Sequence, residues 1–370
     1  MKIAFIGSKG IPASYGGVEK VVEQLSLECI KCGHNVTVYS RFYYSPNKIR
    51  RFIYKDVNVI NIKGIITKRL DVLTHSFIAA ILASFSDCDV VAFHSTVPGF
   101  FSFIPKLFGK KIFIHSHGLE ILGYKWNRFD KFVMKVLIRC TSKFVDGFTT
   151  VSESQIDLCK KYYNRIPKLI PNGIDLIKKI PNTEKKNYVL FVGRLVPDKG
   201  LEYLIEAFLM VNKVVPNYQL FIAGEYSYSN SYHKKITSFL SNSKNIIFLG
   251  GIYGETLHKY YQEALFVVIP SLIESFSHVL VEALWLNGAV ICSDIPQFKL
   301  FVKDYVLFFE AKNSQSLKEK MLYLLINKDA IAELISISKN FPFEQYSWKH
   351  IANKYVKLYS QNFNNYLLNS

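Results

Sequence analysis

The sequence contains no uninterrupted apolar run of about 18 residues, the length that a membrane-spanning helix requires. The apolar run within residues 1–7 is too short for a signal peptide, and no cleavage-like site follows it. The six cysteines form no repeated pair pattern, because Cys29 and Cys32 have no second CxxC with which to complete a zinc site. We therefore expect a cytoplasmic protein with reduced thiols.

Two ligand-binding patterns are incomplete. Gly7 and Gly10 do not make a full GxGxxG, and the second expected strand ends in Tyr-Ser-Arg at residues 39–41 rather than in an acidic residue. Binding of a dinucleotide cofactor is therefore the weaker alternative for the first glycine-rich loop. Apart from the triplet Asp87-Cys88-Asp89, which stands at the start of an expected strand, no DxD-type carboxylate cluster is present that could hold a metal between phosphates. We expect neither a cofactor nor a metal.

The composition fits a globular protein of two domains. The chain has 370 residues, of which 49% are hydrophobic and 20% are charged. The net charge of +17 is uneven: residues 1–180 hold 27 Lys and Arg against 13 Asp and Glu, and the remainder holds 19 against 16. A basic N-terminal half indicates a polyanionic partner or a solvated basic face. The basic residues are scattered and form no known nucleic-acid module, so we expect an anionic membrane or phosphorylated lipid rather than nucleic acid.

Short β-branched runs alternate with segments whose apolar residues recur at helical spacing, as in Val18–Ile30. This repeat is typical of a parallel sheet covered by helices on both faces. The expected strands are Ile3–Ile6, Asn35–Tyr39, Val57–Ile62, Asp89–Phe93, Lys111–His115 and Gly147–Val151, then Tyr188–Val192, Gln219–Ala223, Ile246–Leu249, Leu265–Ile269, Ala289–Cys292 and Val306–Phe309. Further helices are expected near 200–213, 255–264, 276–287 and 315–325.

The turn-rich segment from Pro171 to Asn182 separates the two halves. The pattern predicts an α/β protein with a Rossmann-like N-terminal domain over residues 1–175 and a Rossmann-like C-terminal domain over 176–345. The final amphipathic segment, 346–370, is expected as a helix that could pack back on the N-terminal domain.

The loop between the first strand and the first helix contains Gly16 and Gly17. Exposed backbone N–H groups and the helix dipole favour an anion there, and a residue without Cβ allows close approach. A second loop, GRLVPDKG at residues 193–200, follows the first strand of the second half. Arg194 and Lys199 would lie at the carboxyl edge of a parallel sheet, where such folds bind ligands, and could neutralise a diphosphate.

The segment ESFSHVLVE at residues 274–282 follows a strand that is expected to be buried. Its two carboxylates, Glu274 and Glu282, lie about two helical turns apart on nearly one face, with Glu274 before the helix. Carboxylates accept hydrogen bonds from sugar hydroxyls, and the helix N-terminus at Ser277, His278 and Val279 can bind a phosphate. The alternative is an ordinary amphipathic surface helix, in which the two acids are exposed to solvent and bind no ligand.

Three histidines and Glu225 stand near expected strand ends, and Glu19 follows the first glycine-rich loop. His117 is a candidate for the reaction centre, whereas we interpret His94 and His115 as structural. Glu225 and Glu19 are candidates for contacts with the acceptor or the sugar.

The paired cations at 194 and 199 and the paired acids at 274 and 282 resemble the donor-site signature of glycosyltransferase family 4. The resemblance extends over nearly the whole chain, from Gly16-Gly17 through PNGID at residues 171–175 to Glu282. It implies the GT-B fold, in which two Rossmann-like domains with parallel sheets face each other across a cleft. The opening IGSKGIPASYGGVE is similar to a bacterial subgroup that contains rhamnosyltransferases of capsule and cell-wall polysaccharide assembly.

The resemblance also implies roles for single residues. Arg194 and Lys199 would bind the donor diphosphate, Glu274 the transferred sugar and Glu282 the nucleotide ribose. Gly17 would approach the phosphate from the other domain, and His117 matches the family's histidine near the donor sugar. Relatives often carry Gly where Ser277 stands.

The implied function is metal-independent transfer with retention of anomeric configuration. The donor would be a dTDP-, UDP- or GDP-sugar, with rhamnose suggested by the subgroup, and the acceptor a lipid-diphosphate-linked sugar or oligosaccharide in capsule, O-antigen or cell-wall synthesis. We expect peripheral contact with the inner face of an anionic cytoplasmic membrane, made by the basic N-terminal half and by aromatic residues such as Phe100, Phe101, Phe103 and Trp126. The alternative is that most of these aromatic residues belong to the core. The alternatives are a GT-B sugar-nucleotide epimerase, which needs no second substrate, and a non-catalytic sugar-nucleotide-binding protein.

Overall fold

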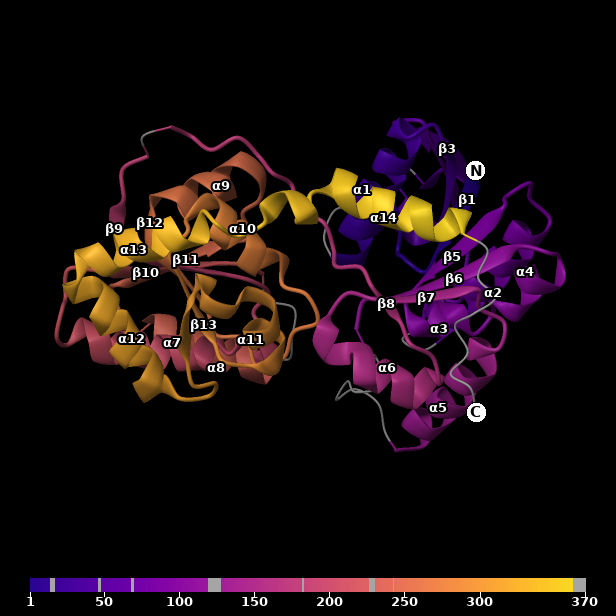
Figure 1. Ribbon diagram of the computed structural model, residues 1–370. Coiled ribbons are helices and arrows are strands. Elements are labelled where there is room, and N and C mark those ends of the chain that lie inside the picture. Colours follow the sequence, from indigo (N-terminus) through magenta and orange to yellow (C-terminus); the bar gives the residue numbers. More distant parts are fainter. Residues whose placement is uncertain are drawn as a thin grey trace. The chain divides into compact units, whose positions relative to one another are not determined.

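A computed structural model describes residues 1–13, 17–45, 48–67, 70–118, 128–181, 183–225, 230–241 and 243–361. The chain divides into two compact units. The N-terminal domain comprises Met1–Gly173 and the chain from Gln345 onward, and the C-terminal domain comprises Ile174–Glu344. Each is an α/β unit built on a single sheet (Figure 1).

The N-terminal sheet has the strand order β3-β4-β2-β1-β5-β6-β7-β8. All neighbouring strands pair in parallel except β3 and β4, which are antiparallel. The chain places β2 to β4 on one side of β1 and then β5 to β8 on the other side, so the strand order reverses between β1 and β5. The strands are β1 (Lys2–Ile6), β2 (Asn35–Arg41), β3 (Arg51–Tyr54), β4 (Val57–Ile62), β5 (Val90–His94), β6 (Lys111–Ser116), β7 (Gly147–Thr150) and β8 (Lys168–Leu169).

Alternate residues of these strands face different helix layers, as the two-residue period of a strand requires. Ile3 and Phe5 belong to the core that includes α1 and α14, whereas Ala4 and Ile6 belong to the core that includes α2, α5 and α6. Because both faces are covered, β5 is buried at every position. The helices are α1 (Gly17–Lys31), α2 (Leu70–Ser84), α3 (Thr96–Gly99), α4 (Phe103–Leu107), α5 (Arg128–Ser142), α6 (Ile156–Tyr163) and α14 (Trp348–Ser360).

The last helix, α14, returns to the N-terminal domain and packs on α1. Its N-terminus is capped by Ser347, whose side chain accepts a hydrogen bond from the His350 backbone N–H. Trp348, the first residue of α14, packs closely against Gly173 at the end of the first part of the N-terminal domain, because a Cβ on Gly173 would lie 2.3 Å from the Trp348 ring. The fold of the N-terminal domain is therefore completed by residues that follow the C-terminal domain in the sequence.

The C-terminal sheet has six parallel strands in the order β11-β10-β9-β12-β13-β14, and its order reverses between β9 and β12. The strands are β9 (Lys186–Val192), β10 (Gln219–Ala223), β11 (Ile246–Gly250), β12 (Ala264–Ile269), β13 (Val290–Ser293) and β14 (Leu307–Phe309). Helices α7 and α12 pack together over one face, and α9 and α10 lie over the other (Figure 1). The helices are α7 (Leu201–Asn212), α8 (Asn230–Ser241), α9 (Gly254–Glu263), α10 (His278–Leu286), α11 (Pro296–Val302), α12 (Ser314–Ile326) and α13 (Lys328–Ser338).

The expected α/β architecture is confirmed, and every strand predicted from the sequence is present within two residues at each end. Sequence analysis missed the strands β3 and β8, and it gave no range for the helices α2 to α6, α8, α11 and α13. Strand β3 is a four-residue antiparallel edge strand in which exposed and half-buried residues alternate, so it lacks the continuous apolar run of its neighbours. The final helix spans residues 348–360, which is shorter than the predicted segment, and residues 362–370 lie outside the described part of the chain.

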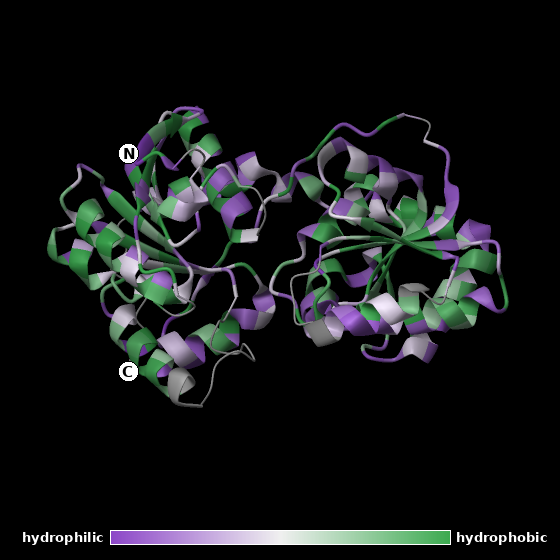
Figure 2. Ribbon diagram, turned by 180° about the vertical axis from the view of Figure 1, so that it is seen from behind, coloured by the Kyte–Doolittle hydropathy of each residue, from purple (hydrophilic) through white to green (hydrophobic). Residues whose placement is uncertain are grey.

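Hydrophobic residues are concentrated in the strands of each sheet (Figure 2). Among the described residues, no helix combines the length and the apolar character that crossing a membrane requires. All six cysteines carry free thiols. Burial raises the pKa of Cys29 and of Cys159 to about 12, which suppresses thiolate formation at both positions.

His75 in α2 makes the stability of the fold depend on pH. Burial, assisted by the charge of Arg41, lowers its pKa from 6.5 to about 4. The folded state therefore binds fewer protons than the unfolded state between these values, and the free energy of unfolding falls as the pH falls from 6.5 to 4. His75 should account for roughly 3 kcal/mol of this loss. Chemical denaturation at a series of pH values should show a flatter dependence for His75→Gln.

The exposed His350 offers a matched control. His350→Gln should leave the pH dependence of the wild-type protein unchanged. An equal slope in His75→Gln and the wild type would show that His75 is not the titrating group.

Candidate functional site

In the C-terminal domain, the two segments singled out in the sequence meet at the carboxyl edge of the sheet. The loop Gly193–Gly200 leaves β9 and the segment 270–277 leaves β12, and the strand order reverses between these two strands. In open α/β sheets this reversal opens the crevice where ligands bind. The topology therefore places both segments at the expected ligand site, although they lie far apart in the sequence.

The two segments are fastened to each other by their backbones. The Leu272 N–H donates to the Asp198 carbonyl at 2.8 Å. Gly200 has a φ of 62° in the left-handed region, and a Cβ there would lie 2.1 Å from the Pro270 carbonyl oxygen. Only glycine fits this close approach. On the other side of the loop, the Leu195 N–H donates to the Glu225 carbonyl at 2.9 Å.

A charged contact also joins the same two segments. Lys199 Nζ donates to Glu274 Oε1, which also accepts a hydrogen bond from Ser271 Oγ at 3.0 Å. The Lys199 side chain is 19% exposed and that of Glu274 is 10% exposed. In such a setting each charge offsets the desolvation of the other. The sequence predicted a separate ligand contact for each residue, and the structure adds that they contact each other.

The helix that follows Glu274 begins as predicted. Ser277 caps α10, because its side chain accepts a hydrogen bond from the Leu280 N–H at 3.2 Å. Its φ of −100° is extended backbone that any residue adopts, so Ser stands here without strain. His278 and Val279 form the first turn, and Glu282 lies half-buried within the helix.

The remaining candidates of this domain lie at the same edge. Arg194 is in the loop with Lys199, and its side chain is exposed. Glu225 follows β10, and its Oε1 accepts a hydrogen bond from the Tyr253 hydroxyl at 3.0 Å. The structure thus joins Lys199 directly to Glu274, with Arg194 and Glu225 on the neighbouring turns.

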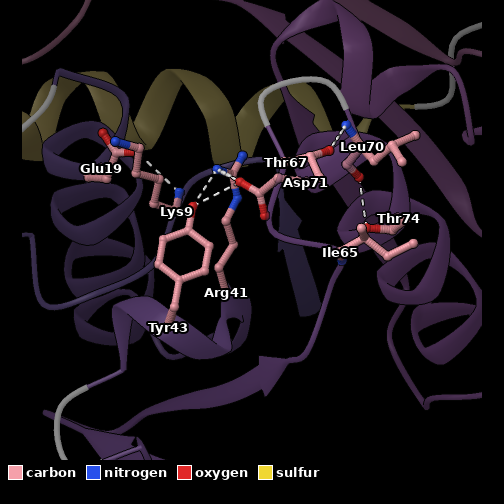
Figure 3. Close-up of polar contacts among 9 residues, drawn as sticks. All are labelled: Lys9, Glu19, Arg41, Tyr43, Ile65, Thr67, Leu70, Asp71 and Thr74. Atoms are coloured by element: carbon pink, nitrogen blue, oxygen red, sulfur yellow. Dashed lines mark hydrogen bonds and ion pairs between the residues drawn. The ribbon is translucent and has the colours of Figure 1, made fainter.

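In the N-terminal domain, the first loop is held by two carboxylates of α1. Glu19 Oε1 accepts a hydrogen bond from the Lys9 N–H at 3.0 Å, and Glu23 Oε2 accepts one from the Ala13 N–H at 2.7 Å. Glu19 is buried, and Figure 3 shows its side chain directed at Lys9. The sequence predicts that Glu19 contacts the acceptor or the sugar. The structure shows its side chain hydrogen-bonded to the backbone of the first loop.

The glycines of this loop differ in their surroundings. A Cβ on Gly7 would lie 2.3 Å from the His94 carbonyl oxygen, so the end of β1 is packed against the end of β5. Gly17 begins α1, and a Cβ there would meet nothing within 4 Å. This open space is compatible with the approach of a ligand. Gly16 lies outside the described residues.

Three histidines lie at the ends of β5 and β6, next to the strand reversal. His117 Nε2 and His94 Nδ1 are 2.9 Å apart, and the two rings are stacked with an interplanar angle of 9°. Burial lowers the pKa of His117 to about 4 and that of His94 and His115 well below 6.5, so all three are neutral at pH 7. Within the described residues, no group of three or more His, Cys, Asp or Glu side chains is arranged to hold a metal ion.

A polar cluster that sequence analysis missed lies at the end of β2 (Figure 3). Arg41 Nη1 donates to Asp71 Oδ2 at 2.6 Å and to the Tyr43 hydroxyl at 2.9 Å, and the Tyr43 hydroxyl donates to Asp71 Oδ2 at 2.8 Å. The Arg41 N–H donates to the Lys9 carbonyl at 2.7 Å, which ties the cluster to the first loop. The only sign of this cluster in the sequence is Arg41, a basic residue at the end of the second strand, where a dinucleotide-binding fold would carry an acidic residue.

Comparison with protein families matches each domain to a glycosyltransferase family. Residues 15–178 match the family described as Glycosyltransferase Family 4, and residues 174–341 match the family described as Glycosyl transferases group 1. The fold agrees. Sucrose-phosphate synthase from Thermosynechococcus elongatus superimposes with a TM-score of 0.81 over 97% of this chain and 98% of its own, at 21% identity.

Curated relatives include enzymes that build bacterial glycans. The lipopolysaccharide 1,2-N-acetylglucosaminetransferase of Salmonella typhimurium is 27% identical over 222 residues, which cover 52% of this chain and 57% of that protein. The N-acetylgalactosamine-N,N'-diacetylbacillosaminyl-diphospho-undecaprenol 4-alpha-N-acetylgalactosaminyltransferase of Campylobacter jejuni is 26% identical over 241 residues, which cover 62% of this chain and 64% of that protein. The match spans about half to two thirds of the length of such relatives.

The contact between Lys199 and Glu274 predicts a coupled loss of stability. Lys199→Met leaves a mostly buried carboxylate without its cation, and should lower the free energy of unfolding by about 2 kcal/mol. Glu274→Gln should have a similar effect, and the double variant should recover at least about 1 kcal/mol relative to the sum of the two. Urea unfolding of the four proteins measures this coupling.

The pair formed by Lys299 and Asp294 is the matched control, because its side chains are 55% and 32% exposed. The same cycle there should give a coupling of less than about 1 kcal/mol. Equal coupling at both pairs would refute a special role for the contact between Lys199 and Glu274.

Proposed function

We propose that this chain, a GT-B glycosyltransferase with a family 4 domain followed by a group 1 domain, is a retaining enzyme that moves a sugar from a nucleoside diphosphate donor to a lipid-linked or oligosaccharide acceptor. The observation that carries the proposal is the contact of Lys199 with Glu274 at the strand reversal of the C-terminal domain, in the loop that also carries Arg194. It joins a cation suited to phosphate and an acid suited to hydroxyls at the point where such sheets bind ligands.

The donor diphosphate binds to Arg194 and Lys199. Lys199 exchanges Glu274 for a phosphate oxygen, so its own charge keeps an anionic partner, and hydrogen bonds from the sugar hydroxyls to Glu274 offset the loss of its cation. The released Glu274 then accepts hydrogen bonds from the transferred sugar. Glu282 binds the ribose, and the backbone at Ser277, His278 and Val279 faces the phosphates.

The reaction is a same-face displacement. The bond from the anomeric carbon to the diphosphate oxygen breaks, the acceptor oxygen bonds to that carbon from the same face, and the leaving diphosphate takes the acceptor's proton. The negative charge that develops on the leaving group is stabilised by the two cations, which makes a metal ion unnecessary. The enzyme otherwise contributes the positioning of the two substrates.

The acceptor binds to the N-terminal domain. His117 follows β6, Gly17 begins α1, and the cluster of Arg41, Tyr43 and Asp71 lies between the end of β2 and the first turn of α2. The cluster offers the charged and hydroxyl groups that recognise sugars. The names of the two relatives given above support a lipopolysaccharide or a sugar on undecaprenol diphosphate as the acceptor. We propose that the transfer belongs to capsule, O-antigen or cell-wall synthesis. Rhamnose from a dTDP donor is supported by the resemblance of the first loop alone.

The N-terminal domain also offers a surface for an anionic membrane. The α2–α4 surface consists of exposed apolar side chains on α2, on α4 and on the residue directly after each of them. The two helices pack together and are largely green in Figure 2. Phe85 is 74% exposed and Leu107 is 77% exposed, and the rings of Phe85 and Phe108 are 4.8 Å apart. Residues 71–146 carry nine Lys and Arg against six Asp and Glu, and this basic excess favours anionic lipid. The other members of the surface are Phe77, Ile78, Leu82 and Phe103.

The α2–α4 surface shares only Phe103 with the aromatic residues that the sequence suggested as membrane contacts. Phe100 and Phe101 are partly buried against the core of the domain, whereas Phe103 is exposed. Trp126 lies outside the described residues.

Donor turnover tests the proposed activity. Incubation with UDP-, GDP- and dTDP-sugars should show slow hydrolysis of one donor, with full activity in EDTA. Arg194→Ala and Glu274→Gln should each lower kcat/KM by about 100-fold or more, because each removes a charged contact made in the transition state. Lys213→Ala, at an exposed cation of the same domain, should leave it unchanged.

Three results would contradict the proposal or a part of it. Isomerisation of the donor sugar without a second substrate would indicate an epimerase. Tight binding of a donor with no turnover in the presence of lipid-linked acceptors would indicate a binding protein, and loss of activity in EDTA that magnesium restores would refute metal independence.

Vesicle flotation tests the membrane surface. The wild-type chain should float with vesicles rich in anionic lipid at physiological salt, and the triple variant Phe85→Ser, Leu107→Ser, Phe108→Ser should lose at least half of this binding. Ile326→Ser, at an exposed apolar residue of α12, should float like the wild type. Equal flotation of the triple variant would disprove the assignment of the α2–α4 surface.

A further inference from the structure

Ser95 has a backbone conformation that a residue with a side chain rarely adopts. It lies directly after β5 and before α3, with a φ of 99° and a ψ of 159°. This region is open almost only to glycine, because a Cβ there crowds the neighbouring backbone. In the described part of the chain, none of the six other non-glycine residues with a positive φ exceeds 68°. The strain at Ser95 therefore needs an explanation of its own.

The chain around Ser95 holds it in this conformation. The Ser95 N–H donates to the His115 carbonyl at 2.9 Å, which extends the pairing of β5 with β6. Gly7 packs against the preceding peptide, because a Cβ on Gly7 would lie 2.3 Å from the His94 carbonyl oxygen. The Thr96 hydroxyl is hydrogen-bonded to the hydroxyl of the last residue of α6. Strained backbone persists only where the surrounding structure fixes it in this way.

The serine side chain does not help to build this turn. Ser95 occupies the N-cap position of α3, where a serine ordinarily accepts a hydrogen bond from the helix backbone, but its side chain makes no such bond to the described residues of α3. A glycine would adopt the same backbone angles without strain. The hydroxymethyl group is therefore what serine adds at this position, and it is added at a cost in stability.

The position of Ser95 in the sheet points to a ligand. It directly follows β5, the strand that neighbours β1 at the strand reversal of the N-terminal sheet, where open α/β sheets bind ligands. The residues on either side, His94 and Thr96, are buried, whereas Ser95 is half-buried. The first loop follows β1 on one side of β5, and His117 follows β6 on the other side. Ser95 thus lies between two elements that the proposed function assigns to substrate binding.

We propose that Ser95 contacts the acceptor, and that its strained turn holds the serine hydroxyl in place for a hydroxyl group of the acceptor sugar. A serine hydroxyl both donates and accepts hydrogen bonds, so it matches a sugar hydroxyl in either direction. Fixing this group before the acceptor binds reduces the ordering that binding requires. The identity of the ligand rests on the proposed glycosyl transfer, whereas the strain at Ser95 does not.

Calorimetry of the full chain tests the strain without any substrate. Ser95→Gly should raise the melting temperature of the N-terminal domain by about 2 to 4 °C, because relief of the strain exceeds the extra chain entropy of glycine. Ser95→Ala keeps a Cβ and should melt within about 1 °C of the wild type. A Ser95→Gly variant that melts at or below the wild-type temperature would overturn the proposal.

Asn164 provides the matched control in the same domain. It has a φ of 52° at the end of α6, in the left-handed conformation that asparagine tolerates. Asn164→Gly should therefore melt within about 1 °C of the wild type. An equal rise in Asn164→Gly and Ser95→Gly would show that Ser95 carries no special strain.

Initial rates test the contact with the acceptor. The donor is the nucleotide sugar that the donor screen selects, and the probe acceptors are glucose, N-acetylglucosamine and N-acetylgalactosamine, each linked through diphosphate to a short polyprenyl chain. Ser95→Ala and Ser95→Gly should each lower the ratio of sugar transfer to donor hydrolysis by about five- to tenfold, as expected for one hydrogen bond to the acceptor. An unchanged ratio in a folded Ser95→Ala would contradict the contact.

Failure of this inference is distinguishable from failure of the proposed function. A wild-type chain that neither hydrolyses any donor nor transfers a sugar would count against the proposed function, while calorimetry still measures the strain. A wild-type chain that transfers the sugar, together with a Ser95→Ala variant that transfers it equally well, would count against the role of Ser95 alone.

Discussion

The charged contact between Lys199 and Glu274 is the interaction on which the rest of the account depends. It forms because β9 and β12 are neighbours at the point where the strand order reverses, so that loops starting some 75 residues apart meet at one edge. The backbone junction at Gly200 and Pro270 leaves no room for adjustment. Lys199 and Glu274 are held in place by this junction. They can therefore exchange their contact with each other for contacts with the phosphate and the sugar of the donor with little reorganisation.

The N-terminal domain repeats the same arrangement. Its strand order reverses between β1 and β5, where the end of β1 at Gly7 packs against His94 and where His117 completes the neighbouring strand end. The polar groups of each domain thus gather at the edge that the topology selects. The parallel sheets explain why: their carboxyl ends share one edge, and both faces are already covered by helices.

Much of this was predictable from local patterns. Buried parallel strands such as Val90–His94 are continuous apolar runs, and cations or acids directly after them, such as Arg194 and Glu274, mark the carboxyl edge. Contacts between distant segments were not predictable. The pairing of Lys199 with Glu274, of His94 with His117 and of Arg41 with Asp71 depends on strand order and side-chain rotamers, which no local pattern encodes. The short edge strand β3 was missed because only its pairing with β4 defines it.

A crystal structure with a bound nucleoside diphosphate, chosen from UDP, GDP and dTDP by affinity, tests the central claim most directly. The account predicts that the diphosphate lies at the reversal between β9 and β12, with phosphate oxygens within hydrogen-bond distance of Arg194 and Lys199 and with Lys199 separated from Glu274. A nucleotide bound at any other place, or a diphosphate that leaves Lys199 on Glu274, would contradict it.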